Sequence, residues 1–253
     1  MNTLKPTERF SNRVSDYVKY RPGYPTALIT YLVECCGLTP NHVVADIGSG
    51  TGLLTRPFLD HGNRVYGVEP NAAMRSAAEE LLHDYNNFES LSGQAEETPL
   101  GVKSIDWIIA GQAFHWFDRP ATKLEFVRIL KPGGWIALIW NRRISSDPFH
   151  QAYEKFLLAH APDYSVVSYR RPAAQELEQF FAPAAMEMAT FEHHQVFDFD
   201  GLKGRLLSCS YAPKQDAENY GEMMDELRSL FQRYSHADRL LFRYTTCLYY
   251  AQL

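Results

Sequence analysis

Residues 43–52 read VVADIGSGTG, an apolar run that passes into three alternating glycines. The run has the length and composition of a buried strand, and an expected helix over 53–59 follows it. Glycine has no Cβ, so the backbone of such a loop can approach a ligand closely. The first N–H groups of the following helix are open donors for a polar or anionic group. The stretch therefore predicts a strand, a ligand-binding loop and a helix.

Two common glycine loops do not fit this spacing. A phosphate-binding P-loop needs Lys and then Ser or Thr after its last glycine, but Leu53 and Leu54 follow Gly52. A dinucleotide loop that begins at Gly48 needs Gly or Ala where Leu53 stands. A nucleotide-linked oxidoreductase is therefore disfavoured. What remains is an acid, Asp46, two residues ahead of a G-x-G-x-G run.

A second acid follows the next apolar run. Residues 64–69 read RVYGVE, a short strand that ends in Glu69, 21 positions after Gly48. A carboxylate at this place can accept hydrogen bonds from both ribose hydroxyls of an adenosyl group. Pro70 and Asn71 then begin the next expected helix. The two acids would lie at the ends of neighbouring strands.

Around these motifs, short apolar runs alternate with segments of helical periodicity. The strand-like runs are 42–47, 64–68, 88–91, 105–110 and 134–140. The helical segments are 25–36, 53–59, 71–85 and 119–130, and the last of them stops at the KPGG turn of 131–134. Such alternation implies right-handed crossovers and a parallel sheet covered on both faces. We therefore predict a doubly wound α/β fold.

The alternation loosens after residue 140. We expect helices over 148–160, 173–181 and 218–234 and strands over 185–199 and 240–250. The two late strands would extend the sheet to a mostly parallel one of seven strands, and the late helices would form a lid. The chain then divides into an N-terminal loop and helix covering the site (1–37), a core (38–145), and a lid with the last strands (146–253).

The glycine stretch carries a family resemblance. Asp46, Gly48, Gly50 and Gly52 match the first motif, (D/E)-x-G-x-G-x-G, of the class I S-adenosylmethionine (SAM) dependent methyltransferases. The resemblance covers about residues 43–140 and implies their Rossmann-like fold, SAM as cofactor and S-adenosylhomocysteine as product. It also implies a set of cofactor-binding residues on the loop and beside the second acid: Asp46, Gly48, Ser49, Gly50, Gly52, Glu69 and Pro70.

The segment after the third strand, 93–96 (GQAE), matches the part of these enzymes that passes the adenine. The resemblance makes Gln94, Ala95 and Glu96 cofactor-binding residues. Gln94 stands where the family often has Asp, and its side-chain carbonyl can accept a hydrogen bond from the adenine amino group. The alternative is a loop glutamine in water.

The segment after the fourth strand, 110–117 (AGQAFHWF), is similar to that of small-molecule methyltransferases related to trans-aconitate methyltransferase. The resemblance puts Gln112 beside the methionine part of the cofactor. It makes His115 and Trp116 the catalytic residues at the reacting methyl group, with His115 the candidate general base. The alternative is a half-buried histidine among packed aromatic side chains; for Phe114 and Phe117 core packing is the favoured interpretation.

The stretch 16–25 (DYVKYRPGYP) has the composition of an ordered loop. Tyr17, Tyr20, Arg21 and Tyr24 could close over the cofactor, with Tyr20 and Arg21 as binding residues and Arg21 paired with the cofactor carboxylate. A loop packed on the surface is the alternative.

The acceptor is expected to be a small molecule. No N-P-P-Y tetrad or Pro-Cys pair follows the fourth strand, and the net charge of −5 disfavours nucleic acid. A carboxylate acceptor could be held by Arg142 and Arg143 after the fifth strand, or by Arg170 and Arg171 in the lid, although solvent exposure is the alternative for each. The predicted function is methyl transfer to this acceptor; a SAM-binding sensor or scaffold without turnover is the second hypothesis.

The chain of 253 residues is 45% hydrophobic and 22% charged, which is the balance of an ordinary globular protein. We expect its four cysteines to be free thiols in a reducing compartment. None of the four cysteines has metal-ligand spacing, and His193 and His194 would point to opposite faces of a strand, so no metal is expected. Residues 1–14 are polar, and no apolar run approaches the roughly 20 residues of a membrane span. We expect a cytoplasmic monomer or homodimer without a membrane partner.

Overall fold

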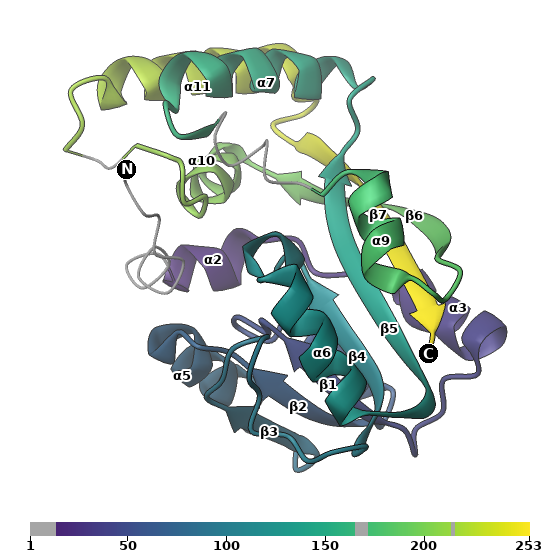
Figure 1. The fold of residues 1–253 in the computed structure, drawn as a ribbon. Helices are drawn as coiled ribbons and strands as arrows, with labels where there is room; N and C mark the ends of the chain where they lie inside the picture. The colour runs from purple at the N-terminus through teal and green to yellow at the C-terminus, as the bar shows by residue number, and fades with distance from the viewer. Residues whose placement is uncertain (1–13, 165–171, 214–215) are drawn as a thin grey trace.

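The computed structural model describes residues 14–164, 172–213 and 216–253. Seven strands form one sheet in the order β3-β2-β1-β4-β5-β7-β6 (Figure 1). Strand β7 lies between β5 and β6 and is antiparallel to both, whereas the other strands of the described sheet all run in one direction. The predicted seven-stranded, mostly parallel α/β sheet is confirmed. The strands are β1 Val43–Ile47, β2 Arg64–Val68, β3 Phe88–Leu91, β4 Ile105–Gly111, β5 Leu130–Arg143, β6 Glu187–Phe197 and β7 Leu240–Gln252.

Helices cover both faces of the sheet, as a doubly wound fold requires. One face packs against α3 (Thr26–Cys36) and α4 (Thr55–Asp60), the other against α6 (Arg119–Ile129) and α9 (Ala174–Phe181). Strand β4 shows why its residues 107–110 form a continuous apolar run. Trp107 lies in the core on the α3 and α4 side, and its neighbour Ile108 lies in the core on the α6 and α9 side.

A third core lies above the carboxyl ends of the parallel strands. It joins α7 (Pro148–His160), α10 (Phe199–Leu207) and α11 (Tyr220–Tyr234), which we call the lid, to the near ends of β6 and β7 (Figure 1). Apolar side chains from all three helices meet there, among them Phe156, Leu206 and Leu227. The amphipathic pattern of the late helices is explained by this separate core.

The N-terminal segment differs from the prediction. Residues 16–25 were expected to form a loop, but Val14–Tyr20 is a helix, α2, and only the residues after it are extended. Packing explains the helix: the Tyr20 ring lies so close to Gly204 of α10 that a Cβ there would be 2.1 Å from it. A tertiary contact of this kind leaves no local sequence signal.

Two predicted boundaries in the second half are also wrong. The predicted strand 185–199 runs too far, because Asp198 caps α10 by accepting a hydrogen bond from the Gly201 N–H at 2.8 Å. The KPGG segment belongs to the start of β5 rather than to a separate turn. The Gly133 N–H donates to the Leu253 carbonyl, and the Leu253 N–H donates to the Gly134 carbonyl. Arg170 and Arg171, the predicted lid arginines, lie outside the described residues.

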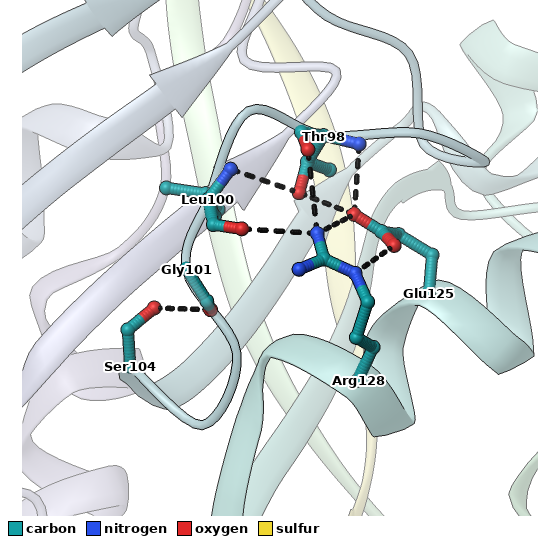
Figure 2. Close-up of polar contacts among 6 residues, drawn as sticks. All are labelled: Thr98, Leu100, Gly101, Ser104, Glu125 and Arg128. Atoms are coloured by element: carbon teal, nitrogen blue, oxygen red, sulfur yellow. Dashed lines mark hydrogen bonds and ion pairs between the residues drawn. The ribbon is translucent and has the colours of Figure 1, made fainter.

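An ion pair with a buried carboxylate fixes the loop that follows the 93–96 segment. The Glu125 carboxylate of α6 accepts from Arg128 at 2.6 Å and from the Thr98 N–H at 2.8 Å (Figure 2). Arg128 in turn donates to the carbonyls of Thr98 and Leu100. Burial opposes the charge, but the hydrogen bonds from Arg128 and Thr98 hold the pKa of Glu125 at about 2. The loop beside the candidate site is therefore tied to a rigid helix.

Candidate functional site

Two adjoining cavities lie at the carboxyl ends of the parallel strands. The strand cavity, about 280 Å³, is lined by residues that follow β2, β3 and β4, among them Glu69, Gln94 and Phe117. The lid cavity, about 180 Å³, is lined by residues of the glycine loop, α2 and the lid, among them Asp46 and Arg205. The residues common to both are Tyr17, Gly48, Gly50, Gly111, Gln112 and Trp116. The two cavities therefore meet at the glycine loop.

The glycine loop joins β1 to α4 and lies against the end of β2. The N–H groups of Gly48 and Ser49 both donate to the Val68 carbonyl, at 2.8 and 3.2 Å. Gly48 has φ +73°, and a Cβ on it would lie 2.6 Å from Cβ of Ala113. Gly50 has φ +57°, and a Cβ on it would meet nothing within 4 Å. The open side of Gly50 gives bare backbone to the cavities, as close approach by a ligand requires.

Gly52 has a packing role in the structure. Its φ is +84°, and a Cβ there would lie 2.6 Å from Cδ1 of Leu82. It lines neither the strand cavity nor the lid cavity. The third glycine of the motif therefore brings the chain against α5 (Ala72–Leu81) and its C-terminal end.

Glu69 is a buried acid, 9% exposed, at the edge of the strand cavity. Its Oε2 accepts from the Gly50 N–H at 3.0 Å, and its Oε1 accepts from the Asn71 N–H at 2.8 Å. Burial raises the pKa of Glu69, and these two N–H groups partly oppose the rise. Each oxygen keeps a further lone pair, so the carboxylate can also accept hydroxyl protons from a ligand.

Asp46 is more deeply buried, 1% exposed, and lines the lid cavity. Its Oδ2 accepts from the Thr55 hydroxyl at 2.7 Å, whereas its Oδ1 has no hydrogen-bond partner in the described part of the chain. Burial, with a smaller contribution from the charge of Glu69, raises the pKa of Asp46 to about 7. A buried carboxylate oxygen without a donor suits a cationic group such as an ammonium.

The other predicted residues of the second and third strand ends also line the strand cavity. They are Pro70, Gln94, Ala95 and Glu96. Gln94 is exposed and Ala95 is buried, and Glu96 is fixed by the Asp118 N–H at 2.7 Å. Met74 and Phe117 add apolar walls that the sequence analysis did not assign to the site. Polar edges between apolar walls suit a flat heteroaromatic group.

Gln112 lies where the two cavities meet, in a strained conformation with φ +56°. Its side-chain amide donates to the Asn141 carbonyl at 3.1 Å. His115 and Trp116 follow on a 3₁₀ helix, Phe114–Trp116, with ring centroids 4.9 Å apart, and both line the lid cavity. Phe114 is fully buried in the core, as its interpretation as a packing residue predicts.

The N-terminal residues divide between the site and the packing. Tyr17, Arg21 and Tyr24 line the lid cavity, and Arg21 Nη2 donates to the Ser208 carbonyl at 3.1 Å. Tyr20 lines neither cavity and packs on Gly204 instead. The structure therefore brings Arg21, but not Tyr20, to the cavity wall.

The lid and the segments next to it add polar and aromatic residues, most of which sequence reasoning missed. They line the far wall of the lid cavity: Arg143, Tyr153, Tyr164, Arg205, Tyr211 and Tyr244. They come from β5, α7, α10, β7 and connecting segments, so no local spacing could have joined them. Arg142, paired with Arg143 in the prediction, lines neither cavity because side chains alternate along a strand.

In the described ranges, no three His, Cys, Asp or Glu side chains gather where they could bind a metal ion. His193, one of the two adjacent histidines, stacks on the Tyr244 ring with centroids 5.1 Å apart. None of the helices in the described residues has the length and hydropathy to cross a membrane.

Comparisons with known proteins agree with this geometry. Residues 45–138 match the family model described as a methyltransferase domain. An uncharacterized methyltransferase-like protein of Schizosaccharomyces pombe is 25% identical over 94% of this chain and 92% of its own. An uncharacterized methyltransferase of Mycobacterium tuberculosis is 35% identical over 53% of this chain and 52% of its own. The solved structure of a candidate type II methyltransferase from Anaeromyxobacter dehalogenans superposes with a TM-score of 0.64 at 22% identity, covering 92% of this chain and 98% of the other.

Proposed function

Given that this chain is a SAM-dependent methyltransferase of the class I fold, we propose that it methylates a small-molecule acceptor held in the lid cavity. The observation that carries the proposal is the junction of the two cavities beside Gly50 and Gln112. A cofactor with its adenosyl group in the strand cavity and its methionine part at the near end of the lid cavity would present its methyl group to an acceptor deeper in the lid cavity. The trans-aconitate-like subtype is proposed only from the resemblance of 112–117.

We assign the adenosyl group to the strand cavity. Glu69 would accept hydrogen bonds from the ribose hydroxyls. The hydrogen bond from the Gly50 N–H already fixes this carboxylate against the glycine loop. Gln94 and Ala95 would lie along the adenine, between the apolar walls of Met74 and Phe117. The open face of Gly50 fits this group, because a side chain there would fill the space it needs.

We assign the methionine part to the near end of the lid cavity. The free Oδ1 of Asp46 would accept from the methionine ammonium, which removes the cost of a buried carboxylate oxygen without a donor. Arg21, on the same cavity wall, would pair with the methionine carboxylate. Gln112 would lie beside the sulfur, held by its bond to Asn141.

The residues of the chain then act mainly by positioning. Bound SAM supplies an electrophilic methyl group: a lone pair of the acceptor bonds to the methyl carbon while the C–S pair returns to sulfur, which leaves S-adenosylhomocysteine. The cavity walls fix the line of approach, and such positioning can supply about 7–11 kcal/mol. His115 would take the proton of an acceptor that has to lose one. Trp116, beside it, would keep water from the methyl group.

The test combines ligand binding with turnover. S-adenosylhomocysteine at about 100 times its Kd should raise the free energy of unfolding by about 2.7 kcal/mol, and NADH should not. A metabolite panel with SAM should then give acceptor-dependent release of S-adenosylhomocysteine. Binding without release from any acceptor would favour the sensor or scaffold hypothesis. Stabilisation by NADH alone would contradict the assignment of the glycine loop.

A further inference from the structure

The lid contains a buried arginine whose guanidinium has no carboxylate partner in the described part of the chain. Arg205 of α10 is 8% exposed. Its Nε donates to the Tyr244 hydroxyl at 3.1 Å, and its Nη1 donates to Sγ of Cys209 at 3.1 Å. Among residues 14–164, 172–213 and 216–253, no carboxylate forms an ion pair with it. A buried cation that serves only as a structural link is normally paired with an anion.

A second guanidinium lines the same cavity. Arg143, 15% exposed at its side chain, donates from Nη2 to Glu154 at 2.6 Å and to the Tyr164 hydroxyl. Its guanidinium also lies over the rings of Tyr153 and Tyr164, at 5.4 and 5.5 Å. Glu154 is 44% exposed, so water screens much of its charge. Both arginines line the lid cavity and keep donors that these contacts do not use.

The surroundings of the two arginines fit an anion. The Tyr164 and Tyr244 hydroxyls on the same wall already donate to Glu154 and Gln195, so a bound oxygen would be held by the two guanidinium groups. Cys209 reports the local potential: burial alone would raise the pKa of its thiol, but the charges of Arg21 and Arg205, with hydrogen bonds from Tyr211 and Arg205, lower it. Planar guanidinium forks match the two oxygens of a carboxylate.

We propose that Arg143 and Arg205 form an anion-binding subsite in the lid cavity, which holds a carboxylate of the acceptor while another atom of the acceptor faces the methyl group. The inference rests on the proposed function, because it needs the acceptor in the lid cavity. Arg21 is left to the cofactor carboxylate.

Benzoate, its neutral analogue benzamide, and phenyl phosphate are suitable probes, measured by calorimetry on the full chain saturated with S-adenosylhomocysteine. We expect benzoate to bind about tenfold or more tightly than benzamide, since charged hydrogen bonds in a dry site have that strength. Arg205→Met and Arg143→Met should each abolish most of this preference. Arg142→Met is the matched control and should keep it, because Arg142 lines neither cavity.

Each outcome decides the proposal. Equal binding of benzoate and benzamide, no binding of either, or a preference that survives both substitutions would overturn it. Tighter binding of phenyl phosphate than of benzoate would assign the subsite to a phosphate and overturn the carboxylate. If Arg205→Met does not fold, Arg143→Met alone carries the comparison. Binding of S-adenosylhomocysteine is measured in the same samples, so its failure would contradict the proposed function, whereas a failure of benzoate alone contradicts only the subsite.

Discussion

Asp46 and Glu69 are both buried acids of the candidate site, but they differ in the donors that they already have. Glu69 accepts two backbone N–H groups, one for each oxygen. Asp46 accepts one hydroxyl, and its Oδ1 lacks a partner among the described residues. Glu69 is therefore already anchored in the loop, whereas Asp46 would gain most from a cationic ligand.

The raised pKa of Asp46 predicts a pH dependence of cofactor binding. Without ligand the carboxyl group has a pKa of about 7, and an ammonium beside it would lower that value. Binding therefore favours the ionised form and strengthens as pH rises through 7. We expect affinity for S-adenosylhomocysteine to be about tenfold weaker at pH 6 than at pH 8, measured relative to Asp46→Asn. The ligand itself titrates in the same way in both measurements, so equal pH profiles for the two proteins would show that Asp46 does not contact the ligand.

His115 predicts a separation of chemistry from binding. His115→Ala should lower kcat by about 10²- to 10⁴-fold if the acceptor must lose a proton, and should change the Kd of S-adenosylhomocysteine little. The measurement is steady-state kinetics with an acceptor from the panel, together with calorimetry. A large loss of cofactor affinity with unchanged kcat would make His115 a binding residue instead.

Among the elements, the glycine loop separates folding from ligand binding at two positions. In Gly48→Ala the new Cβ would lie 2.6 Å from Ala113 at φ +73°, so we expect a loss of about 2–4 kcal/mol in the free energy of unfolding. In Gly50→Ala the Cβ meets no protein atom within 4 Å, so only the strain at φ +57°, about 1–2 kcal/mol, should remain. Gly50→Ala should instead weaken S-adenosylhomocysteine about tenfold or more, because the methyl group enters its space. Chemical denaturation and calorimetry would show this; unchanged affinity in Gly50→Ala would contradict the assignment.

The loop tied to α6 predicts a stability effect with a defined pH range. Glu125→Gln should cost about 2–3 kcal/mol, the usual size for a buried, charged hydrogen-bond partner. Because the folded pKa, about 2, is below the ordinary 4.5, the carboxylate stabilises the fold above pH 4.5, and this contribution is lost as pH falls toward 2.

The control for that measurement is the exposed pair of Arg64 and Glu89, with side chains 58% and 49% exposed. Glu89→Gln should change the free energy of unfolding by less than about 1 kcal/mol at any pH. Denaturation of both variants between neutral and acid pH makes the comparison. A cost for Glu125→Gln no larger than that for Glu89→Gln would show that the ion pair does not hold the loop.

At the scale of the whole molecule, the sequence predicted what local patterns determine. Periodicity and spacing were sufficient for the sheet, its helices on both faces and the motif from Asp46 to Glu69, because each depends on neighbours in the chain. Helix α2 and the lid wall were not predictable in this way. Tyr20 of α2 packs on Gly204, and Arg205 meets Tyr244 only after the lid has folded. Such contacts join residues that no spacing connects.

The most direct test of the account is a crystal structure of the chain with S-adenosylhomocysteine. We expect the ribose hydroxyls on Glu69, the adenine beside Gln94 in the strand cavity, and the amino group on Oδ1 of Asp46. The sulfur should face the lid cavity next to Gln112. A ligand bound elsewhere, or a ribose with no contact to Glu69, would contradict the central claim that the glycine loop and its two acids bind the cofactor.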